Sequence, residues 1–389
     1  MAFLPLLGLA LLALPAQQEA PRLRTLLANG ATLHVERFAG AQVLSVQLFV
    51  SSRSAGENAE THGHRHLLEH LILKGQRGDL DRRMESQGVF FTGRTHRDSI
   101  QFEFTGKPDQ LEALLSGAQE LIVEPKFTQA VIDHERSIMV EEFALVPDHQ
   151  RLSRTAWDAG FGIAGLDPFG TEAAIATATP SSLVKLHQAL FKPSQMVVLV
   201  AGDVDLKETT AKIRSMVEDL PIDDEPASPP KRAGNAARGV AEDAFGEVRA
   251  AVASGIDKDT AATLCAAYGL AAWIEGAHVT YTPSATGGLV LVGRTDANNA
   301  LGSVIDELGE REEAFLYSIG KELARGWIRG QLAAPTSAAS LRGLLLSQAP
   351  HLRPETLLDA IDQVGWSDFR RGVLRFKRDH AVIAVGSRR

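Results

Sequence analysis

Two histidines and a glutamate with the chemistry of a metal-dependent hydrolase lie within five residues of one another: His66, Glu69 and His70. The surrounding run from His64 to Leu73 contains no glycine or proline and is rich in leucine, so it predicts a helix. Residues four apart lie on one face of a helix, and His66 and His70 could therefore bind the same cation. Glu69 lies on that face too, where it could act as a general base toward a water molecule. These residue types predict part of a hydrolytic zinc site.

A catalytic zinc site usually has three protein ligands, and a second predicted helix contains the third candidate. Residues 128–145 contain no glycine or proline. On a helical wheel, Glu135 and Glu142 share one stripe with the apolar Val131, whereas Glu141 falls at its edge. Carboxylates in a buried stripe need a cation or another partner, so Glu142 is the predicted third ligand. The alternative is a partly exposed stripe with both acids in water.

The run from Gly63 to Gly75 resembles the active-site helix of the pitrilysin/insulinase zinc peptidases, a family that includes the mitochondrial processing peptidase. Its His-x-x-Glu-His order is the inverted zincin motif. The family continues with a Glu-Arg pair and a second Glu seven residues after the first, which matches Glu135-Arg136 and Glu142 here. The resemblance implies Zn²⁺ as the cofactor, Glu142 as its third ligand and Glu135 as a carboxylate that supports a ligand.

The strand predicted at 89–94 is also similar to a segment of that family. There, an Asn-Ala-x-Thr segment forms the sheet edge to which an extended substrate adds as a further strand. The corresponding residues here are Thr92, Gly93, Arg94 and Thr95. The resemblance implies that Thr92, Gly93 and Arg94 bind substrate, although the Asn is replaced. An ordinary hairpin turn is the alternative.

One pattern of elements occurs twice: a helix, a short basic turn, an apolar strand and a glycine. The first copy ends with the strand 196–201 and Gly202, and the second ends with 381–385 and Gly386. An internal repeat of this length indicates two similar domains rather than a solenoid. Residues 221–239 are rich in proline, glycine and acidic residues, so they predict a linker.

The resembling family has the same duplicated α+β architecture, typically with zinc in the first copy only. The fold expected here is therefore two tandem α/β sandwich domains. The second is degenerate, because it has no His-x-x-Glu-His motif. The predicted segments are a signal peptide at 1–20, a zinc-binding domain at 21–220, a linker at 221–241 and a second domain at 242–389.

Composition excludes several classes of protein. A net charge of −8 offers no general attraction to nucleic acid or to an anionic membrane. The single cysteine, Cys265, excludes an intrachain disulfide. Residues 1–16 are apolar but too short to span a bilayer, and they predict a cleaved secretory signal, with an anchoring helix as the alternative. We therefore expect a secreted or periplasmic protein without a membrane span.

The second half departs from the family at one pair of residues. In the family, an Arg and, seven residues later, a Tyr flank a Gly-Leu-Ala segment and reach the substrate carbonyl at the zinc. Here Cys265 occupies the Arg position and Ala272 the Tyr position. Assigning Tyr281 to the Tyr position places Ile274 in the Arg position instead. The resemblance therefore implies a homologous partner subunit that supplies the Arg/Tyr pair.

The function expected from these residues is that of a zinc-dependent endopeptidase for peptides or unfolded small proteins, acting as the zinc-bearing subunit of a heterodimer. One alternative is a non-catalytic assembly or peptide-binding subunit of the same fold. Another is a metal-storing or sensing protein that uses the nearby His62 and His64 as extra ligands and has no need of Glu69. If the protein is a zinc endopeptidase, those two histidines are instead expected to be solvated neighbours of the zinc site.

Overall fold

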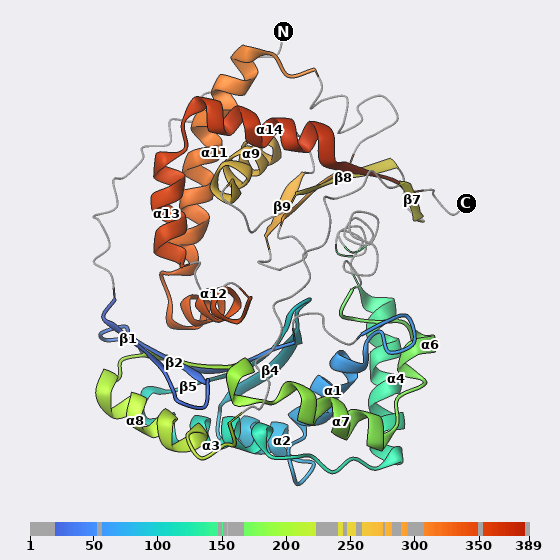
Figure 1. Cartoon of the computed structure of the whole chain (residues 1–389), viewed down its shortest axis with the longest axis vertical. Coiled ribbons are helices and arrows are strands. Elements are labelled where there is room, and N and C mark those ends of the chain that lie inside the picture. The colour runs from blue at the N-terminus through green and yellow to red at the C-terminus, as the bar shows by residue number, and fades with distance from the viewer. Residues whose placement is uncertain are drawn as a thin grey trace.

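The computed structural model describes residues 20–52, 57–146, 150, 154, 167–222, 240–243, 247–253, 259–274, 277–281, 289–294, 307–348 and 353–385. These residues form two sheets with their helices, one toward each end of the long axis (Figure 1). None of the helices in these ranges has the length and apolar character that crossing a bilayer requires.

The first sheet has six strands in the spatial order β1-β2-β6-β3-β5-β4. β2 and β6 run parallel, and all other neighbours in this sheet are antiparallel. Every residue of β3 and β6 is buried, as expected of central strands covered on both faces. The strands are β1 (Arg22–Leu26), β2 (Thr32–Arg37), β3 (Leu44–Ser51), β4 (Phe90–Thr95), β5 (Ser99–Gly106) and β6 (Met196–Gly202).

The second sheet repeats part of this pairing. β11 lies parallel to β7 and antiparallel to β8, just as β6 lies parallel to β2 and antiparallel to β3. The predicted internal repeat is thus confirmed in the strand topology. The spatial order is β7-β11-β8-β10-β9, with β7 (Val240–Asp243), β8 (Glu247–Ala253), β9 (His278–Tyr281), β10 (Leu289–Arg294) and β11 (His380–Val385).

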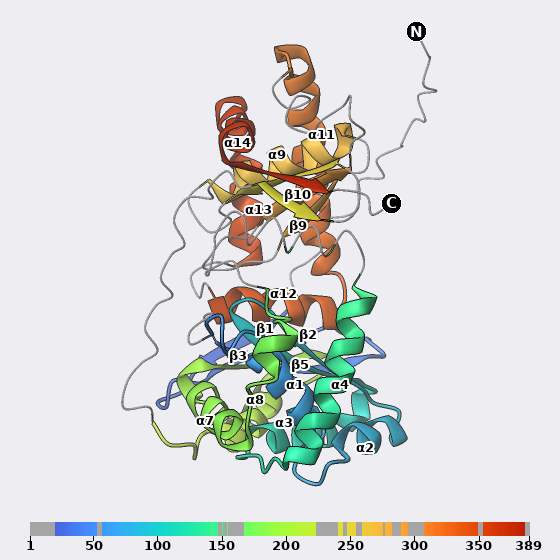
Figure 2. The ribbon, with the colours of Figure 1, turned by 90° about the vertical axis from the view of Figure 1, so that its right-hand side faces the viewer.

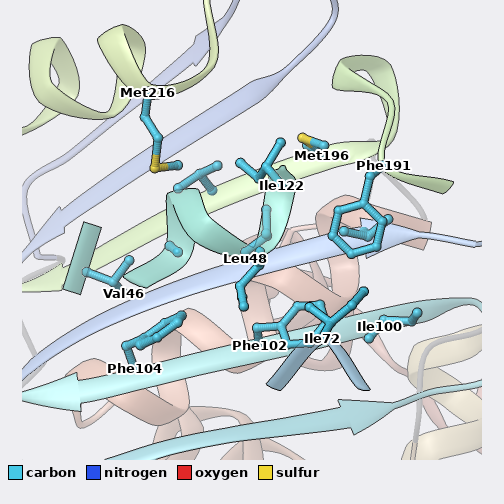
Figure 3. Close-up of a cluster of buried hydrophobic side chains, with 14 of the residues drawn as sticks. Val46, Leu48, Ile72, Ile100, Phe102, Phe104, Ile122, Phe191, Met196 and Met216 are labelled. Carbon is cyan, nitrogen blue, oxygen red and sulfur yellow. The ribbon is translucent and has the colours of Figure 1, made fainter. Parts of the chain in front are cut away.

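Helices of the first half cover one face of the first sheet, and Figure 3 shows the core between them. Phe102 and Phe104 of β5 pack there with Val46 and Leu48 of β3 and with Ile72. The helices of this half are α1 (His64–Leu73), α2 (Leu80–Ser86), α3 (Leu111–Ile122), α4 (Gln129–Leu145), α6 (Glu172–Ile175), α7 (Pro180–Leu190) and α8 (Leu206–Val217), with short 3₁₀ turns η1 (Pro108–Gln110) and η3 (Pro193–Gln195).

The second half is built around two closely packed helices, α9 and α11. A Cβ atom on Gly320 would lie 2.1 Å from the carbonyl oxygen of Cys265, so only glycine permits this approach. Cys265 is fully buried in the contact, which fits a small core thiol. The helices of this half are α9 (Thr260–Trp273), α11 (Glu310–Gln331), α12 (Pro335–Gln348), α13 (Pro354–Gln363) and α14 (Trp366–Asp379).

Helix α12 belongs to the second half in sequence but lies on the open face of the first sheet (Figures 1 and 2). It packs on β3 and β6, where Ala339 joins a small apolar cluster with Phe49 and Leu199. A Cβ on Gly343 would lie 2.0 Å from the Phe49 ring, so this glycine lets the helix approach the sheet.

Coverage by α12 corrects one sequence-based expectation. The alternation of Ile100, Phe102 and Phe104 with polar residues predicts a β5 strand with one buried face. The structure buries both faces: Gln101 is 2% exposed and Glu103 is 6% exposed. The Gln101 side-chain amide donates hydrogen bonds to Gln47 and, at 3.1 Å, to Ser340 of α12.

A buried ion pair also joins α12 to the first sheet. Arg342 donates two hydrogen bonds to Glu36 of β2, at 2.6 and 3.0 Å, and two to Glu355 of α13, at 2.6 and 3.2 Å. Glu36 is 3% exposed and Arg342 is 5% exposed, so neither charge can be solvated without moving α12. The pair therefore fixes the position of α12 on the sheet.

We expect Arg342→Met to destabilise the protein by about 3–5 kcal/mol, because it leaves the Glu36 carboxylate buried without its partner. Chemical denaturation followed by circular dichroism measures the change. Arg325→Met is the matched control, since the partners of Arg325, Glu322 and Asp362, are exposed; its expected cost is about 1 kcal/mol or less. Equal losses for the two variants would contradict this account.

Candidate metal centre and active site

Helix α1 is buried on almost every side: residues 64–72 all lie inside the first half. It begins after Gly63, whose φ of 95° is strained for other residues. A Cβ on Gly63 would lie 2.8 Å from the Cα of Gly170, so the segment 167–170 packs directly on the start of the helix. The predicted bounds of α1 are confirmed, and the helix packs against β4.

His66, His70 and Glu142 come together at the contact between α1 and α4. The Nε2 atoms of the two histidines lie 3.2 Å apart, and Glu142 Oε2 lies 3.6 Å from His66 Nε2 and 3.5 Å from His70 Nε2. Ligand atoms bound tetrahedrally to one zinc ion lie about 3.3–3.5 Å apart, given bonds of about 2.0–2.1 Å. Two imidazoles and one carboxylate at these spacings therefore fit three corners of a zinc site. Within the described ranges this is the one group of three such side chains that could hold a metal.

Glu135 lies behind this group. Its Oε2 is 3.3 Å from His70 Nδ1, and its Oε1 is 3.7 Å from Lys74 Nζ. An Nδ1–H that donates to a carboxylate leaves the Nε2 lone pair free to bind a metal. Glu135 thus lies where its carboxylate can orient the His70 ring; the family resemblance implies this supporting role.

Burial and neighbouring charges set the protonation of the ligand group. Burial, followed by the charge of His70, lowers the pKa of His66 to about 4, so His66 is neutral and offers a lone pair. Burial also lowers the pKa of His70, but hydrogen bonds to Glu135 and Glu142 outweigh it and raise that pKa to about 10. In the metal-free chain the His70 Nε2 therefore carries a proton, which a bound metal would displace. The His70 contact lowers the pKa of Glu142, which stays ionised.

Glu69 is fully enclosed between α1 and β4. Burial raises its pKa to about 7, a value suited to a group that accepts and returns a proton near neutral pH. The Thr95 hydroxyl donates a hydrogen bond of 3.1 Å to Glu69 Oε2. A Cβ on Gly93 would lie 2.2 Å from Glu69 Oε1, so the carboxylate lies directly against the β4 backbone.

The predicted substrate-binding residues Thr92, Gly93 and Arg94 lie on β4. This strand is at the edge of the first sheet and pairs with β5 on one side. Phe90 at its start is 58% exposed. An open strand edge presents main-chain donors and acceptors to an added strand. Glu69 and the edge strand β4 are therefore adjacent.

The apolar face predicted for α4 is partly wrong. The helix begins after Thr128 as predicted, but Val131 is 41% exposed, and Ile132 and Met139 form the apolar contact instead. Glu135 is buried beside them, because it lies three residues after Ile132 and four before Met139. Glu141, the poorer candidate, is exposed.

His62 and His64 lie before the candidate ligands His66 and His70 but face other partners. The His62 ring contacts the carbonyl oxygen of Asp167. His64 Nε2 lies 3.0 Å from the Ala174 carbonyl oxygen and 3.1 Å from Thr177 Oγ1. Both histidines are buried, so the expectation of solvated neighbours is wrong. They tie the start of α1 to segments 167–177.

Several contacts at the site were not predicted from the sequence. Thr95 bonds Glu69, Lys74 approaches Glu135, and the Phe169 ring lies 4.5 Å from the His66 ring. Arg154 stacks on Phe169, with 3.9 Å between its Cζ atom and the ring centre. The i, i+4 spacing of His70 and Lys74 could have indicated the second contact; nothing local in the sequence indicates the Phe169 contact.

In the second half, the residues near the positions where the family has its Arg/Tyr pair belong to the core. Tyr268 and Tyr281 both pack on Trp327, at ring-centre distances of 6.5 and 5.6 Å. The Tyr281 hydroxyl is buried, and Cys265 is fully buried in α9. These side chains stabilise the second half.

Two family descriptions match the chain: "Insulinase (Peptidase family M16)" over residues 35–160 and "Peptidase M16 inactive domain" over residues 177–253. An uncharacterised zinc protease of Mycobacterium leprae is 25% identical over 225 residues, which are 56% of this chain and 51% of that protein. A probable mitochondrial-processing peptidase subunit beta of Arabidopsis thaliana is 25% identical over 52% of this chain and 40% of its own length. The chain thus spans about half or less of these relatives.

Solved structures share the fold over almost the whole chain. A protease from Helicobacter pylori has a TM-score of 0.77 at 18% identity, covering 95% of this chain and 100% of that one. The periplasmic protease PqqL from Escherichia coli has a TM-score of 0.70 at 16% identity, covering 94% of this chain and 48% of that one. Since the family descriptions and the two-part α+β fold agree, the chain belongs to the pitrilysin/insulinase family, peptidase family M16.

Proposed function

We propose that this protein is a zinc-dependent endopeptidase. The observation that carries the proposal is the spacing of His66, His70 and Glu142, which fits a tetrahedral zinc site beside the buried Glu69. Zinc bound there would supply a Lewis acid that polarises the attacking water and the scissile carbonyl. The relatives named as zinc proteases support this assignment.

The chain's own residues divide the remaining work. Glu69 accepts the proton of the attacking water and passes it to the leaving amine. In the metal-free chain, burial raises the pKa of this carboxyl to about 7. The Thr95 hydroxyl and the Gly93 backbone keep the Glu69 carboxylate in place. Glu135 holds the His70 ring in one orientation.

Substrates are proposed to be peptides or unfolded small proteins in extended form. A peptide that pairs with the open edge of β4 through Thr92, Gly93 and Arg94 places its backbone beside Glu69. Folded proteins rarely present a free strand of the required length, so the geometry favours unfolded chains.

The peptidase is further proposed to act as the zinc-bearing subunit of a heterodimer. The absence of an Arg/Tyr pair at positions 265 and 272 supports this. We also propose that the chain divides into domains at residues 21–220 and 242–389, with zinc in the first. The isolated chain should bind zinc yet cleave peptides slowly, because donors to the developing oxyanion are missing.

A partner of the same fold that carries the Arg/Tyr pair should raise the rate of the isolated chain about 100- to 1000-fold. A quenched fluorescent peptide, assayed with and without the co-expressed partner, measures this. Replacing the Arg and Tyr of the partner should abolish the gain while both chains still co-purify. Full activity from the isolated chain, at one zinc per chain, would exclude the heterodimer and leave the peptidase proposal intact.

A secreted or periplasmic location is also proposed, supported by the apolar segment 1–16. Residues 1–19 lie outside the described residues. N-terminal sequencing of the protein from its natural host should find a start between Gln17 and Pro21. A protein recovered from the cytosol that begins at Met1 would refute the location.

A further inference from the structure

A row of polar side chains crosses one face of the first sheet and ends at the edge strand β4. Gln47 of β3 pairs with Glu103 of β5, and Glu103 pairs with Thr92 of β4, so the three side chains point to the same face. This is the face that α12 covers, because the Gln47 amide donates a hydrogen bond of 3.1 Å to the carbonyl oxygen of Thr336. Glu103 therefore lies between α12 and the strand proposed to bind substrate.

Glu103 is a buried carboxylate without an ion pair. It is 6% exposed, and the Thr105 hydroxyl donates a hydrogen bond of 3.3 Å to its Oε1. Its Oε2 has no hydrogen-bond partner, and the carboxylate has no salt bridge, among the residues that the structure describes. Burial raises the pKa of Glu103, although the charge of Arg94 acts in the opposite direction. A buried carboxylate costs free energy unless it is paired, so this position favours a cation.

The opposite face of β4 holds the proposed catalytic base. Gly93 and Thr95 lie against Glu69, whereas the Thr92 side chain points to the other face, because side chains alternate along a strand. A substrate strand added beside β4 has the same alternation. Its residues thus face Glu69 and Glu103 in turn, and those on the Glu103 side can set the sequence preference without taking part in the chemistry.

We infer that Glu103 selects a lysine or arginine in the substrate, at the position that lies beside Thr92. The inference rests on the proposed peptidase function and on substrate pairing with β4. Neighbouring strands are about 4.8 Å apart, so the substrate backbone would lie about 10 Å from that of Glu103. Lysine and arginine have long apolar stems that can cross a small residue such as Thr92 and end in a cation. That cation would reach a buried carboxylate and form a charge-assisted hydrogen bond.

Arg94 is the cation that competes with the substrate for Glu103. It pairs with Gln101 of β5, two residues from the Thr92–Glu103 pair and on the same face of the sheet. The Arg94 side chain is exposed, and its charge acts on the Glu103 carboxyl without a salt bridge. Removing this charge should therefore strengthen the binding of a basic substrate, whereas removing the Glu103 charge should weaken it.

Peptide binding to the zinc-loaded full-length Glu69→Gln chain tests the inference without cleavage. The probes are two fluorescent peptides of alanine, serine and threonine that differ only in one central residue, lysine or norleucine. Fluorescence anisotropy measures the two Kd values. We expect the lysine peptide to bind about tenfold more tightly, because a charge-assisted hydrogen bond replaces an apolar contact of similar length. Equal Kd values for the two peptides would overturn the inference.

Variants in the same background locate the preference. Glu103→Gln keeps the side-chain shape and can still accept the Thr105 hydrogen bond; it should bring the two Kd values to within about twofold. Binding of the norleucine peptide shows that this variant is folded. Arg94→Gln should instead increase the preference for lysine about two- to fivefold.

Glu112→Gln is the matched control, because it removes the same charge at an exposed position on α3, on the other face of the sheet. It should leave the lysine preference unchanged. A preference that survives Glu103→Gln, or that Glu112→Gln reduces equally, would refute the role of Glu103. The result is separable from the peptidase proposal: peptide cleavage without a lysine preference refutes only the inference. A preference that depends on Glu103, in a chain whose Glu69-containing form cleaves no peptide even with its partner, supports the inference and refutes the peptidase.

Discussion

Glu69→Gln should retain about one zinc per chain while losing peptide hydrolysis by about 100-fold or more. Glutamine has almost the same shape and can still accept the Thr95 hydrogen bond, so the fold and the ligand group are preserved. It cannot accept the proton of the attacking water, which is the role assigned to Glu69. Zinc analysis and a quenched-peptide assay on the same sample measure both effects.

Glu103→Gln is the matched control for this variant. Glu103 is also buried, burial also raises its pKa, and the Thr105 hydroxyl lies 3.3 Å from its carboxylate. It lies on β5 opposite Thr92 of the proposed substrate-binding strand, and the charge of Arg94 acts on its carboxyl group. Its substitution can therefore change the KM for peptides, but kcat should stay at the wild-type value. If Glu69→Gln hydrolyses peptides normally, or both variants lose activity equally, the role of Glu69 is wrong.

The second large effect concerns the metal itself. Glu142→Gln should weaken zinc binding by more than the 10- to 100-fold expected for Glu135→Gln, because Glu142 supplies a ligand atom and Glu135 only orients His70. Glu141→Gln is the adjacent control and should keep wild-type affinity, since Glu141 is exposed. Competition with a zinc indicator measures all three.

The opposite order of zinc affinities among these variants would change the assignment of the third ligand. If Glu141→Gln loses zinc while Glu142→Gln keeps it, the third ligand is misassigned. If both keep zinc and bind more than one ion per chain, the metal-storing alternative gains support. His66→Ala should lose zinc in either case, because both assignments need the pair on α1.

The parts of the site that could be predicted from sequence are those that depend on local order. The helix α1 follows from its composition, and the four-residue spacing of His66 and His70 places both on one face. The helical wheel also places Glu135 and Glu142 on one side of α4. It could not fix the phase of the apolar face, because Val131 and Ile132 are equally apolar and only tertiary packing chooses between them.

Contacts between distant segments could not be predicted. The Glu36–Arg342 pair joins residues 306 positions apart, and α12 has no sequence pattern that assigns it to the first sheet. The burial of Gln101 and Glu103 follows from that placement. Neither β1 nor α8 is predicted from the sequence. β1 is only five residues long and contains two arginines. Most of the predicted linker, residues 223–239, lies outside the described residues.

The most direct test of the zinc peptidase assignment is a zinc titration of the metal-free chain in which bound zinc and peptide cleavage are followed together. The proposed ligand group of His66, His70 and Glu142 has room for one ion, so both signals should rise in parallel and level off at about one equivalent. Cleavage is expected to be slow without a partner, yet proportional to bound zinc. Peptide cleavage by the metal-free chain, or zinc binding that leaves cleavage at zero even with the partner present, would contradict the assignment.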